Sequence, residues 1–208
     1  MTDKDDGQKR GRTKAAPLPA EWLEDIKRAV DVMNRGGVIV YPTDTIWGIG
    51  CDAANEEAVR RIFDIKHRAD SKALITLVDS EARIQHYVRC IPDVAWDLID
   101  CAVRPLTIVY DGGRNLAPNL LAEDGSIGLR MTQEPFSREL CRRMKRAVVS
   151  TSANVSGEPS PRCFAEISEE ILSAADYVCT SRRDESGPGA ASTIIRLTES
   201  AEVSIIRP

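Results

Sequence analysis

The chain has 208 residues, of which 42% are hydrophobic and 29% are charged, an ordinary balance for a protein with a buried core. The formal net charge of −4 excludes a globally basic protein, so any contact with phosphate groups must come from a local cluster of cations. No apolar run approaches the roughly 20 residues that a membrane-spanning helix needs, and we expect no contact with a membrane.

The six cysteines form no Cys-x-x-Cys pair, and the only histidines are His67 and His86. A zinc site of the usual kind is therefore not expected. Cysteines with apolar neighbours, such as Cys179, are interpreted as small core residues. A chain of this size needs no disulfide framework, so we expect a cytoplasmic protein.

The first 16 residues contain eight charged side chains and almost no apolar ones. Such a segment cannot bury enough surface to offset the entropy of ordering it, so residues 1–16 are predicted to form a disordered charged tail. The tail lacks the apolar stretch of a secretory signal. Residues 17–208 are predicted to form one domain.

Helix and strand patterns alternate from Pro17 onward. Trp22, Ile26 and Met33 lie on one face of a predicted helix that Gly36-Gly37 ends, and Asn55 is placed to cap a second helix. The pattern predicts a single α/β or α+β domain in which helices cover a mixed sheet. We expect helices over 22–33, 58–65, 81–88, 92–102, 136–146 and 166–172, and strands over 38–41, 73–78, 106–110, 126–131, 147–150, 177–179, 192–197 and 203–206.

Three long loops, over 112–125, 152–162 and 180–191, are the candidates for function. The segment Gly48–Ala53 matches the dinucleotide pattern G-x-G-x-x-A, but Pro42–Trp47 separates it from the preceding strand, so we interpret it as a backbone corner that needs glycine. The chain contains neither a P-loop nor a G-x-S-x-G motif.

Two short polar segments have alternative interpretations. Thr43-Asp44-Thr45 follows a strand and would suit a polar ligand, although turn chemistry after a proline explains it better. In Lys66-His67-Arg68, an extended backbone would point both cations the same way, and an anion between them would relieve their repulsion. A solvated charge run at the end of a helix is the alternative.

The segment Ser150–Gly157 gives the strongest signal, because four hydroxyls and an amide follow a buried strand within eight residues. Arg130 lies inside an apolar strand and needs an anionic partner. Together these features predict an anion-binding cavity that performs phosphoryl or nucleotidyl transfer by positioning and charge stabilisation. The cavity is expected to be lined by Thr45, Lys66, Arg68, Arg130, Ser150 and Ser152.

Several segments, in this order, resemble the YrdC/TsaC family of threonylcarbamoyl-AMP synthases. They are residues 37–50, Lys66-His-Arg68, Pro105-Leu-Thr107, Ile127-Gly-Leu-Arg130, residues 150–157 and Ser192-Thr-Ile-Ile195. The resemblance implies a twisted mixed sheet around a large positively charged cavity. It also implies the formation of threonylcarbamoyl-AMP and diphosphate from L-threonine, bicarbonate and ATP, with Mg²⁺ carried by ATP, no protein metal site and no tightly bound cofactor.

The resemblance also assigns roles to residues and partners. The threonine side would comprise Thr45, Arg130, Ser150 and Ser192; the ATP side would comprise Arg68, Lys72, Ser126, Ser152, Ser160 and Arg207; and Lys66, Arg68, Ser152 and Asn154 would form the catalytic set. The product would serve a tRNA threonylcarbamoyltransferase complex that makes N6-threonylcarbamoyladenosine, and contact with tRNA or double-stranded RNA is expected.

The chain departs from the family pattern at a few positions. Trp47 replaces a tyrosine, alanines stand at 69 and 73 where prolines are usual, Val103-Arg104-Pro105 replaces Pro-Gly-Pro, and Thr132 stands where a proline is expected. These changes bear on rate and affinity more than on reaction type. The alternative functions are a non-catalytic RNA-binding module, suggested by the basic clusters at 60–61, 66–72 and 142–146, and a phosphosugar enzyme on a related fold.

Overall fold

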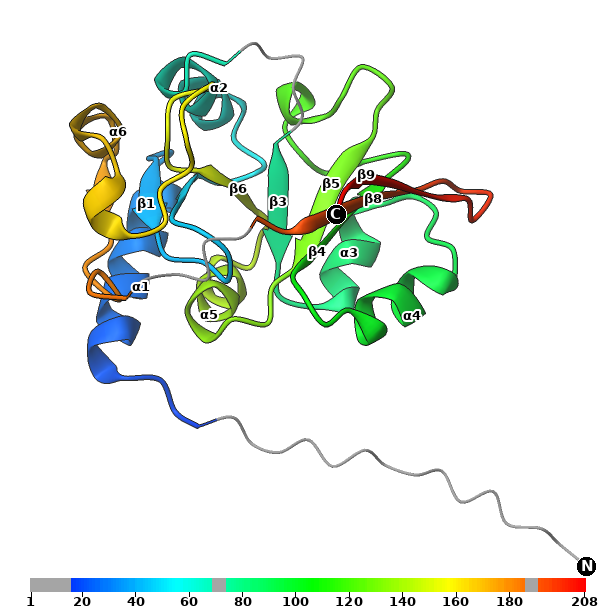
Figure 1. The fold of residues 1–208 in the computed structure, drawn as a ribbon, viewed down its shortest axis with the longest axis horizontal. Coiled ribbons are helices and arrows are strands. Elements are labelled where there is room, and N and C mark those ends of the chain that lie inside the picture. The colour runs from blue at the N-terminus through cyan, green and yellow to red at the C-terminus, as the bar shows by residue number, and fades with distance from the viewer. Residues whose placement is uncertain (1–15, 69–73, 186–190) are drawn as a thin grey trace, which may run out of the picture.

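Nine strands form one mixed sheet in the computed structural model, in the order β7-β1-β2-β6-β3-β5-β4-β8-β9 (Figure 1). The structure describes residues 16–68, 74–185 and 191–208, so the predicted tail over 1–16, except for Ala16, and the predicted ATP ligand Lys72 lie outside the described residues. The strands are β1 (Ile39–Tyr41), β2 (Gly48–Gly50), β3 (Ile75–Val78), β4 (Leu106–Tyr110), β5 (Ile127–Met131), β6 (Val148–Ser152), β7 (Tyr177–Val178), β8 (Thr193–Leu197) and β9 (Val203–Arg207).

Helices pack against this sheet, which confirms the predicted mixed α/β architecture. Asn55 caps one of them as expected, since its side chain accepts a hydrogen bond from the amide of Ala58. Gly36, with φ of +82°, follows the first helix where the sequence predicted its end. The α-helices are α1 (Ala20–Asn34), α2 (Glu56–Ile65), α3 (Glu81–Tyr87), α4 (Val94–Cys101), α5 (Pro135–Met144) and α6 (Glu169–Ala174), with short 3₁₀ turns at Pro118–Leu120 and Phe164–Glu166.

The strand registers divide the sheet into two faces. On one face, apolar side chains of β1, β3 and β6 pack against α1 and α5. On the opposite face, a larger cluster joins the sheet to α2, α3 and α4. Because paired residues share a face, the first face continues through Ser150, Arg130, Thr107, Ile194 and Arg207. These residues belong to neither core cluster, and the candidate site lies on this polar stretch.

The structure differs from the sequence prediction in several elements. The interpretation of Gly48–Gly50 as a corner was wrong: these residues form β2, which pairs with β1 and β6. Strand β6 continues to Ser152, two residues beyond the predicted end. The helix predicted over 166–172 is instead a 3₁₀ turn followed by α6, because Ile167 has an extended backbone between them. Helix α5 ends early at the left-handed Lys145.

The glycines of β2 and β5 provide a test of this packing. A Cβ at Gly50 would collide with the carbonyl oxygen of Val149 and lie 2.9 Å from Cε1 of Tyr41, whereas a Cβ at Gly128 would meet nothing closer than 3.5 Å. We predict that Gly50→Ala lowers the free energy of unfolding by about 1–3 kcal/mol, as overpacking does, while Gly128→Ala changes it by less than about 0.5 kcal/mol. Urea denaturation measures both; equal losses would contradict the description of β2.

Candidate functional site

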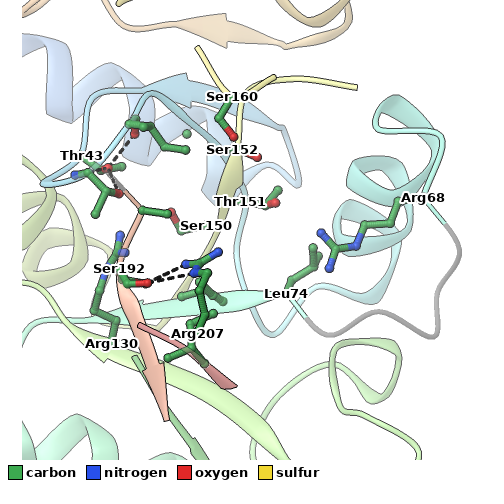
Figure 2. A pocket seen from close by; sticks show the side chains of 16 residues that line it. Thr43, Arg68, Leu74, Arg130, Ser150, Thr151, Ser152, Ser160, Ser192 and Arg207 are labelled. Atoms are coloured by element: carbon green, nitrogen blue, oxygen red, sulfur yellow. Dashed lines mark hydrogen bonds between the residues drawn. The ribbon is translucent and has the colours of Figure 1, made fainter. Parts of the chain in front are cut away.

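A cavity of about 210 Å³ opens on the polar part of the sheet face (Figure 2). Strands β2, β3, β5, β6, β8 and β9 supply its walls, together with the loop after β1 and the turn after α2. It holds three guanidinium groups, and none of the described residues that line it is acidic. The lining residues are Thr43, Thr45, Ile46, Gly48, Arg68, Leu74, Ile75, Arg130, Ser150, Thr151, Ser152, Ser160, Ala191, Ser192, Ile194 and Arg207.

The turn after α2 separates the two cations that the sequence placed side by side. Lys66 has a helical backbone at the end of α2, and His67 has a left-handed φ of 48°, so the extended backbone assumed for residues 66–68 was wrong. The turn directs Arg68 to the cavity, where it lies across from the serines of β6 in Figure 2. Lys66 points elsewhere and is not among the residues that line the cavity.

Lys66 instead lies inside the protein and holds the end of β6. Its ammonium donates hydrogen bonds to the carbonyl oxygens of Ser152, at 2.5 Å, and Asn154, at 2.6 Å. The Lys66 carbonyl in turn accepts a hydrogen bond from the amide of Ser156. These bonds fix the backbone from which the Ser152 side chain reaches the cavity. Lys66 and Asn154 are therefore adjacent to the site without lining it.

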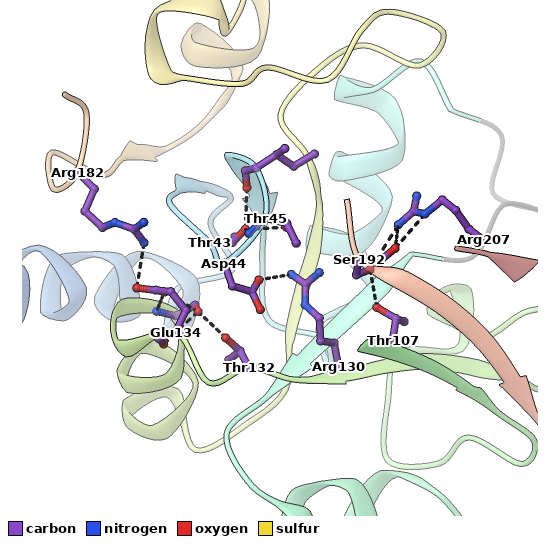
Figure 3. Close-up of polar contacts among 12 residues, drawn as sticks. Thr43, Asp44, Thr45, Thr107, Arg130, Thr132, Glu134, Arg182, Ser192 and Arg207 are labelled. Carbon is purple, nitrogen blue, oxygen red and sulfur yellow. Dashed lines mark hydrogen bonds and ion pairs between the residues drawn. The ribbon is translucent and has the colours of Figure 1, made fainter. Parts of the chain in front are cut away.

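Arg130 forms the floor of the cavity and is almost fully buried, with 4% of its side chain exposed. Its Nη2 lies 3.0 Å from Oδ1 of Asp44, whose side chain is also largely buried (Figure 3). A buried guanidinium is costly without a counter-charge, so Asp44 stabilises Arg130 in place. Arg130 lines this cavity and Asp44 lines a neighbouring one of about 390 Å³, so the ion pair is a wall between the two.

Arg207 and Ser192 form the opposite edge of the site (Figure 3). The Arg207 guanidinium donates to the Ser192 carbonyl from Nε, at 3.0 Å, and from Nη2, at 2.8 Å. The Ser192 hydroxyl also lies 2.9 Å from that of Thr107 and 3.3 Å from Arg207 Nη2. Ser192, which directly precedes β8, thus ties residues of β4 and β9 together at the cavity.

Hydroxyl groups line the side of the cavity next to β1 and β6. Thr43 donates to the Ile46 carbonyl at 2.7 Å, and its hydroxyl also lies 3.0 Å from that of Thr45. The turn interpretation of Thr43-Asp44-Thr45 is therefore correct, yet both threonines line the cavity as well. Ser150 and Ser152 reach it from β6 itself rather than from a loop, because their side chains lie on the cavity face of that strand.

Some residues singled out in the sequence lie away from the cavity wall. Ser126 is buried at the start of β5, where its amide donates to the Asp124 carboxylate. Trp47 packs against Phe164, with ring centroids 5.0 Å apart, and does not line the cavity. Arg104 lines the neighbouring cavity on the far side of Asp44. The loop over 112–125 contributes no described lining residue to the site.

Burial makes this cavity unfavourable for the cations it holds. Burial lowers the pKa of Arg68, and burial together with the nearby Arg130 lowers the pKa of Arg207. Arginine does not lose its proton at such sites, so an anion among these groups would relieve the penalty.

Within the described ranges, no cluster of His, Cys, Asp or Glu side chains could hold a metal ion, and no helix combines the length and apolar character of a membrane span.

Some lining residues were not predicted from the sequence. Gly48, Ile75 and Ile194 pair with Ser152, Ser150 and Thr107, respectively, and only this register shows that they lie on the cavity face. Thr151 also lines the cavity, although it pairs with Ile49 and alternates with Ser150 and Ser152 along β6. Of the residues assigned by resemblance, eight line one cavity: Thr45, Arg68, Arg130, Ser150, Ser152, Ser160, Ser192 and Arg207.

The Lys66 ammonium provides a pH-dependent test of its structural role. Burial, with Arg68 close by, lowers the pKa of Lys66 to about 8 from its usual 10.5. At a pH between these two pKa values, Lys66 is protonated in the unfolded chain but not in the folded protein. The free energy of unfolding therefore rises with pH in this range. We therefore compare the free energy of unfolding of the wild type with that of Lys66→Met. Between about pH 8 and 10, the wild-type value should rise relative to the variant by up to about 1.4 kcal/mol per pH unit. Denaturant titrations measure this difference; a constant gap from pH 7 to 10 would contradict it.

Comparison with known proteins places the chain in a family. The family model Sua5_yciO_yrdC, described as "Telomere recombination", matches residues 31–208. The chain is 33% identical to the threonylcarbamoyl-AMP synthase of Stenotrophomonas maltophilia over 72% of this chain and 82% of that protein. It is 31% identical to the threonylcarbamoyl-AMP synthase of Idiomarina loihiensis over 81% of this chain and 90% of that protein. A P. abyssi Sua5 structure complexed with L-threonine matches at a TM-score of 0.82 and 27% identity, over 92% of this chain and 55% of that one. The chain therefore belongs to the Sua5/YciO/YrdC family.

Proposed function

We propose that this chain is a threonylcarbamoyl-AMP synthase, which forms threonylcarbamoyl-AMP and diphosphate from L-threonine, bicarbonate and ATP. The observation that carries the proposal is a cavity in which Arg68, Arg130 and Arg207 converge with serine and threonine hydroxyls. Such a cavity suits a polyanionic substrate beside a small polar one. Relatives with this name match the chain over most of their length, which gives further support.

We assign threonine to the part of the cavity around Arg130. A guanidinium at the cavity floor, held by Asp44, suits the amino-acid carboxylate. Ser150, Thr45 and Ser192 surround this floor and offer hydroxyls for the polar side chain and amine. The P. abyssi relative is described as complexed with L-threonine, which supports an amino-acid site in this fold.

We assign the ATP phosphates to the part of the cavity between Arg68, Ser152, Ser160 and Arg207. Arginine suits this task because its planar fork matches phosphate oxygens. Lys66 would act as a positioning residue, since its bonds to the Ser152 and Asn154 carbonyls set the wall that faces Arg68. Lys72 and Ser126 remain predicted ATP contacts. Lys72 lies outside the described residues, and Ser126 is buried and does not line the cavity.

The proposed reaction needs two bond-forming steps. The threonine amine, having lost a proton to solvent, attacks the carbon supplied by bicarbonate, and a carbamate forms as water is released. A carbamate oxygen then attacks the α-phosphorus of ATP, and the bond to the β-phosphate oxygen breaks as diphosphate leaves. Arg68 and Arg207 would stabilise charge that builds on the phosphates, and Arg130 would hold the attacking molecule in line.

Mg²⁺ would enter this cavity on the nucleotide. The described lining contains no carboxylate to hold a metal ion, so the phosphate oxygens of ATP would be its main ligands. When bound in this way, Mg²⁺ would neutralise part of the charge on the leaving diphosphate.

The product would leave for a tRNA threonylcarbamoyltransferase that modifies adenosine, and the enzyme would make contact with tRNA. The cysteines are free, and together with the use of ATP this supports a cytoplasmic location. The alternative of an RNA-binding module without catalysis is less well supported, because three of the cations in the basic run 142–146 already form ion pairs. Arg142 and Arg143 pair with Glu139, and Arg146 pairs with Asp52.

Radiolabelled ATP tests the proposed function. We predict that the chain forms an AMP adduct and diphosphate only when L-threonine and bicarbonate are both present. Arg68→Ala should lower turnover by roughly 10²–10³-fold, as the loss of a preorganised donor does. Arg60→Ala is the control, because Arg60 pairs with glutamates on the exposed surface of α2. Adduct formation that ignores threonine, or near-normal diphosphate release by Arg68→Ala, would contradict the proposal.

The Asp44–Arg130 pair gives a separate prediction about threonine. Asp44→Asn keeps the shape of the side chain but removes the counter-charge of a buried guanidinium, so Arg130 should lose its fixed position. We predict a KM for threonine roughly tenfold higher, on the order of 1.4 kcal/mol of binding, with the KM for ATP little changed. Asp44→Glu should recover part of the loss, and Asp64→Asn, an exposed carboxylate change on α2, should have no effect. Equal increases in both KM values would contradict a positioning role.

A further inference from the structure

The last strand of the sheet exposes apolar side chains that nothing in the described structure covers. Val203, Ile205 and Ile206 of β9 are 48%, 73% and 57% exposed, respectively, and all five residues of the strand are exposed. Of the large hydrophobic residues that the structure describes as exposed, only Val103 lies outside this strand. Exposed apolar residues gathered in this way indicate an interaction surface.

These side chains extend the buried core of the protein beyond its covered part. Val203 pairs with Leu197, and Ile205 pairs with Ile195, so each pair shares one face of the sheet. Leu197 and Ile195 are 1% and 6% exposed, respectively, and belong to the larger core cluster. The apolar layer therefore continues from β8 onto β9, where the helices of that face no longer cover it. The cavity lies on the opposite face, with Arg207.

The backbone of β9 is also unpaired along its outer edge. It is the terminal strand in the sheet order, and Figure 1 shows the β8–β9 hairpin extending past the neighbouring strands. In the connecting turn, the Thr198 amide donates to the Glu202 carbonyl. The alternation of an antiparallel ladder then directs the Ser204 backbone toward β8 and leaves the amides of Val203 and Ile205 directed outward. An edge of this kind is a template for another strand.

We propose that β9 pairs with β9 of a second copy of this chain, antiparallel and about a two-fold axis at Ser204. This axis preserves the faces of the sheet and places Val203 opposite the partner's Ile205, so the two apolar patches form one continuous layer. The charges at the strand ends favour the same direction. Glu202 precedes the strand and Arg207 ends it, so antiparallel pairing keeps like charges at opposite ends of the interface, whereas parallel pairing would bring like charges together.

The interface formed in this way is small. A pair of five-residue strands buries less than the roughly 1,200–2,000 Å² of a stable complex, so we expect a reversible dimer with a Kd on the order of 10–100 µM. The proposal does not depend on the proposed function, because Ile205 faces away from the cavity.

Analytical ultracentrifugation of the full chain tests this interface. We expect the mass-average molecular weight to rise from monomer toward dimer between about 1 µM and 500 µM, a range that spans the expected Kd. Ile205→Lys should weaken the association at least tenfold, since it places a charge at the centre of the patch. Val103→Lys is the matched control, because Val103 is equally apolar and fully exposed but lies outside β9. It should leave the association unchanged.

Hydrogen exchange gives an independent readout that needs no variant. The Val203 and Ile205 amides should exchange more slowly at 500 µM than at 1 µM, while those of buried β8 should not change. A chain that stays monomeric across this range would overturn the proposal. So would a dimer that Val103→Lys disrupts as much as Ile205→Lys does, or one that leaves the β9 amides unprotected.

Discussion

The buried ammonium of Lys66 determines how this site is built. Its hydrogen bonds to the Ser152 and Asn154 carbonyls join the end of α2 to the end of β6. A lysine in such surroundings is costly, because burial removes its hydration, and two backbone carbonyls offset that cost only if they stay in place. The wall that carries Ser152 and the turn that carries Arg68 are therefore held in a fixed relation, and the gap between them is where the phosphates would bind.

The other cations of the site are stabilised in a similar way, each by a different part of the fold. Asp44 holds Arg130 from behind, and the Ser192 carbonyl holds Arg207 from the side. Each guanidinium still faces a cavity without a carboxylate in its described lining. Asp44 and the Ser192 carbonyl fix the positions of Arg130 and Arg207, and the remaining donors of these two groups face the cavity, where a ligand would bind. Electrostatic preorganisation of this kind is the main source of rate enhancement in phosphoryl and nucleotidyl transfer.

Much of this arrangement was predictable from local sequence. The apolar periodicity of α1, the Asn55 cap and the hydroxyl-rich end of β6 each reflect short-range physics, and all three are present. The convergence of Arg68, Arg130 and the β6 serines on one cavity also agrees with the prediction. The predictions that were wrong concern features that depend on contacts between distant parts of the chain. Gly48–Gly50 forms a strand because β1 and β6 pair with it on either side, which the glycine pattern alone does not indicate.

The position of Lys66 shows the same limit for the site. Charge patterning placed Lys66 beside Arg68 on the cavity, because a lysine is usually solvated or bound to an anion. Its carbonyl partners lie 86 and 88 residues away in the sequence, so only the fold could show that it is buried. A crystal structure of the chain with L-threonine and a non-hydrolysable ATP analogue tests this account most directly. The account predicts phosphate oxygens within hydrogen-bond distance of Arg68 and the Ser152 hydroxyl, with the Lys66 ammonium still on its two carbonyls. A Lys66 ammonium bound directly to phosphate, or a triphosphate outside this cavity, would contradict it.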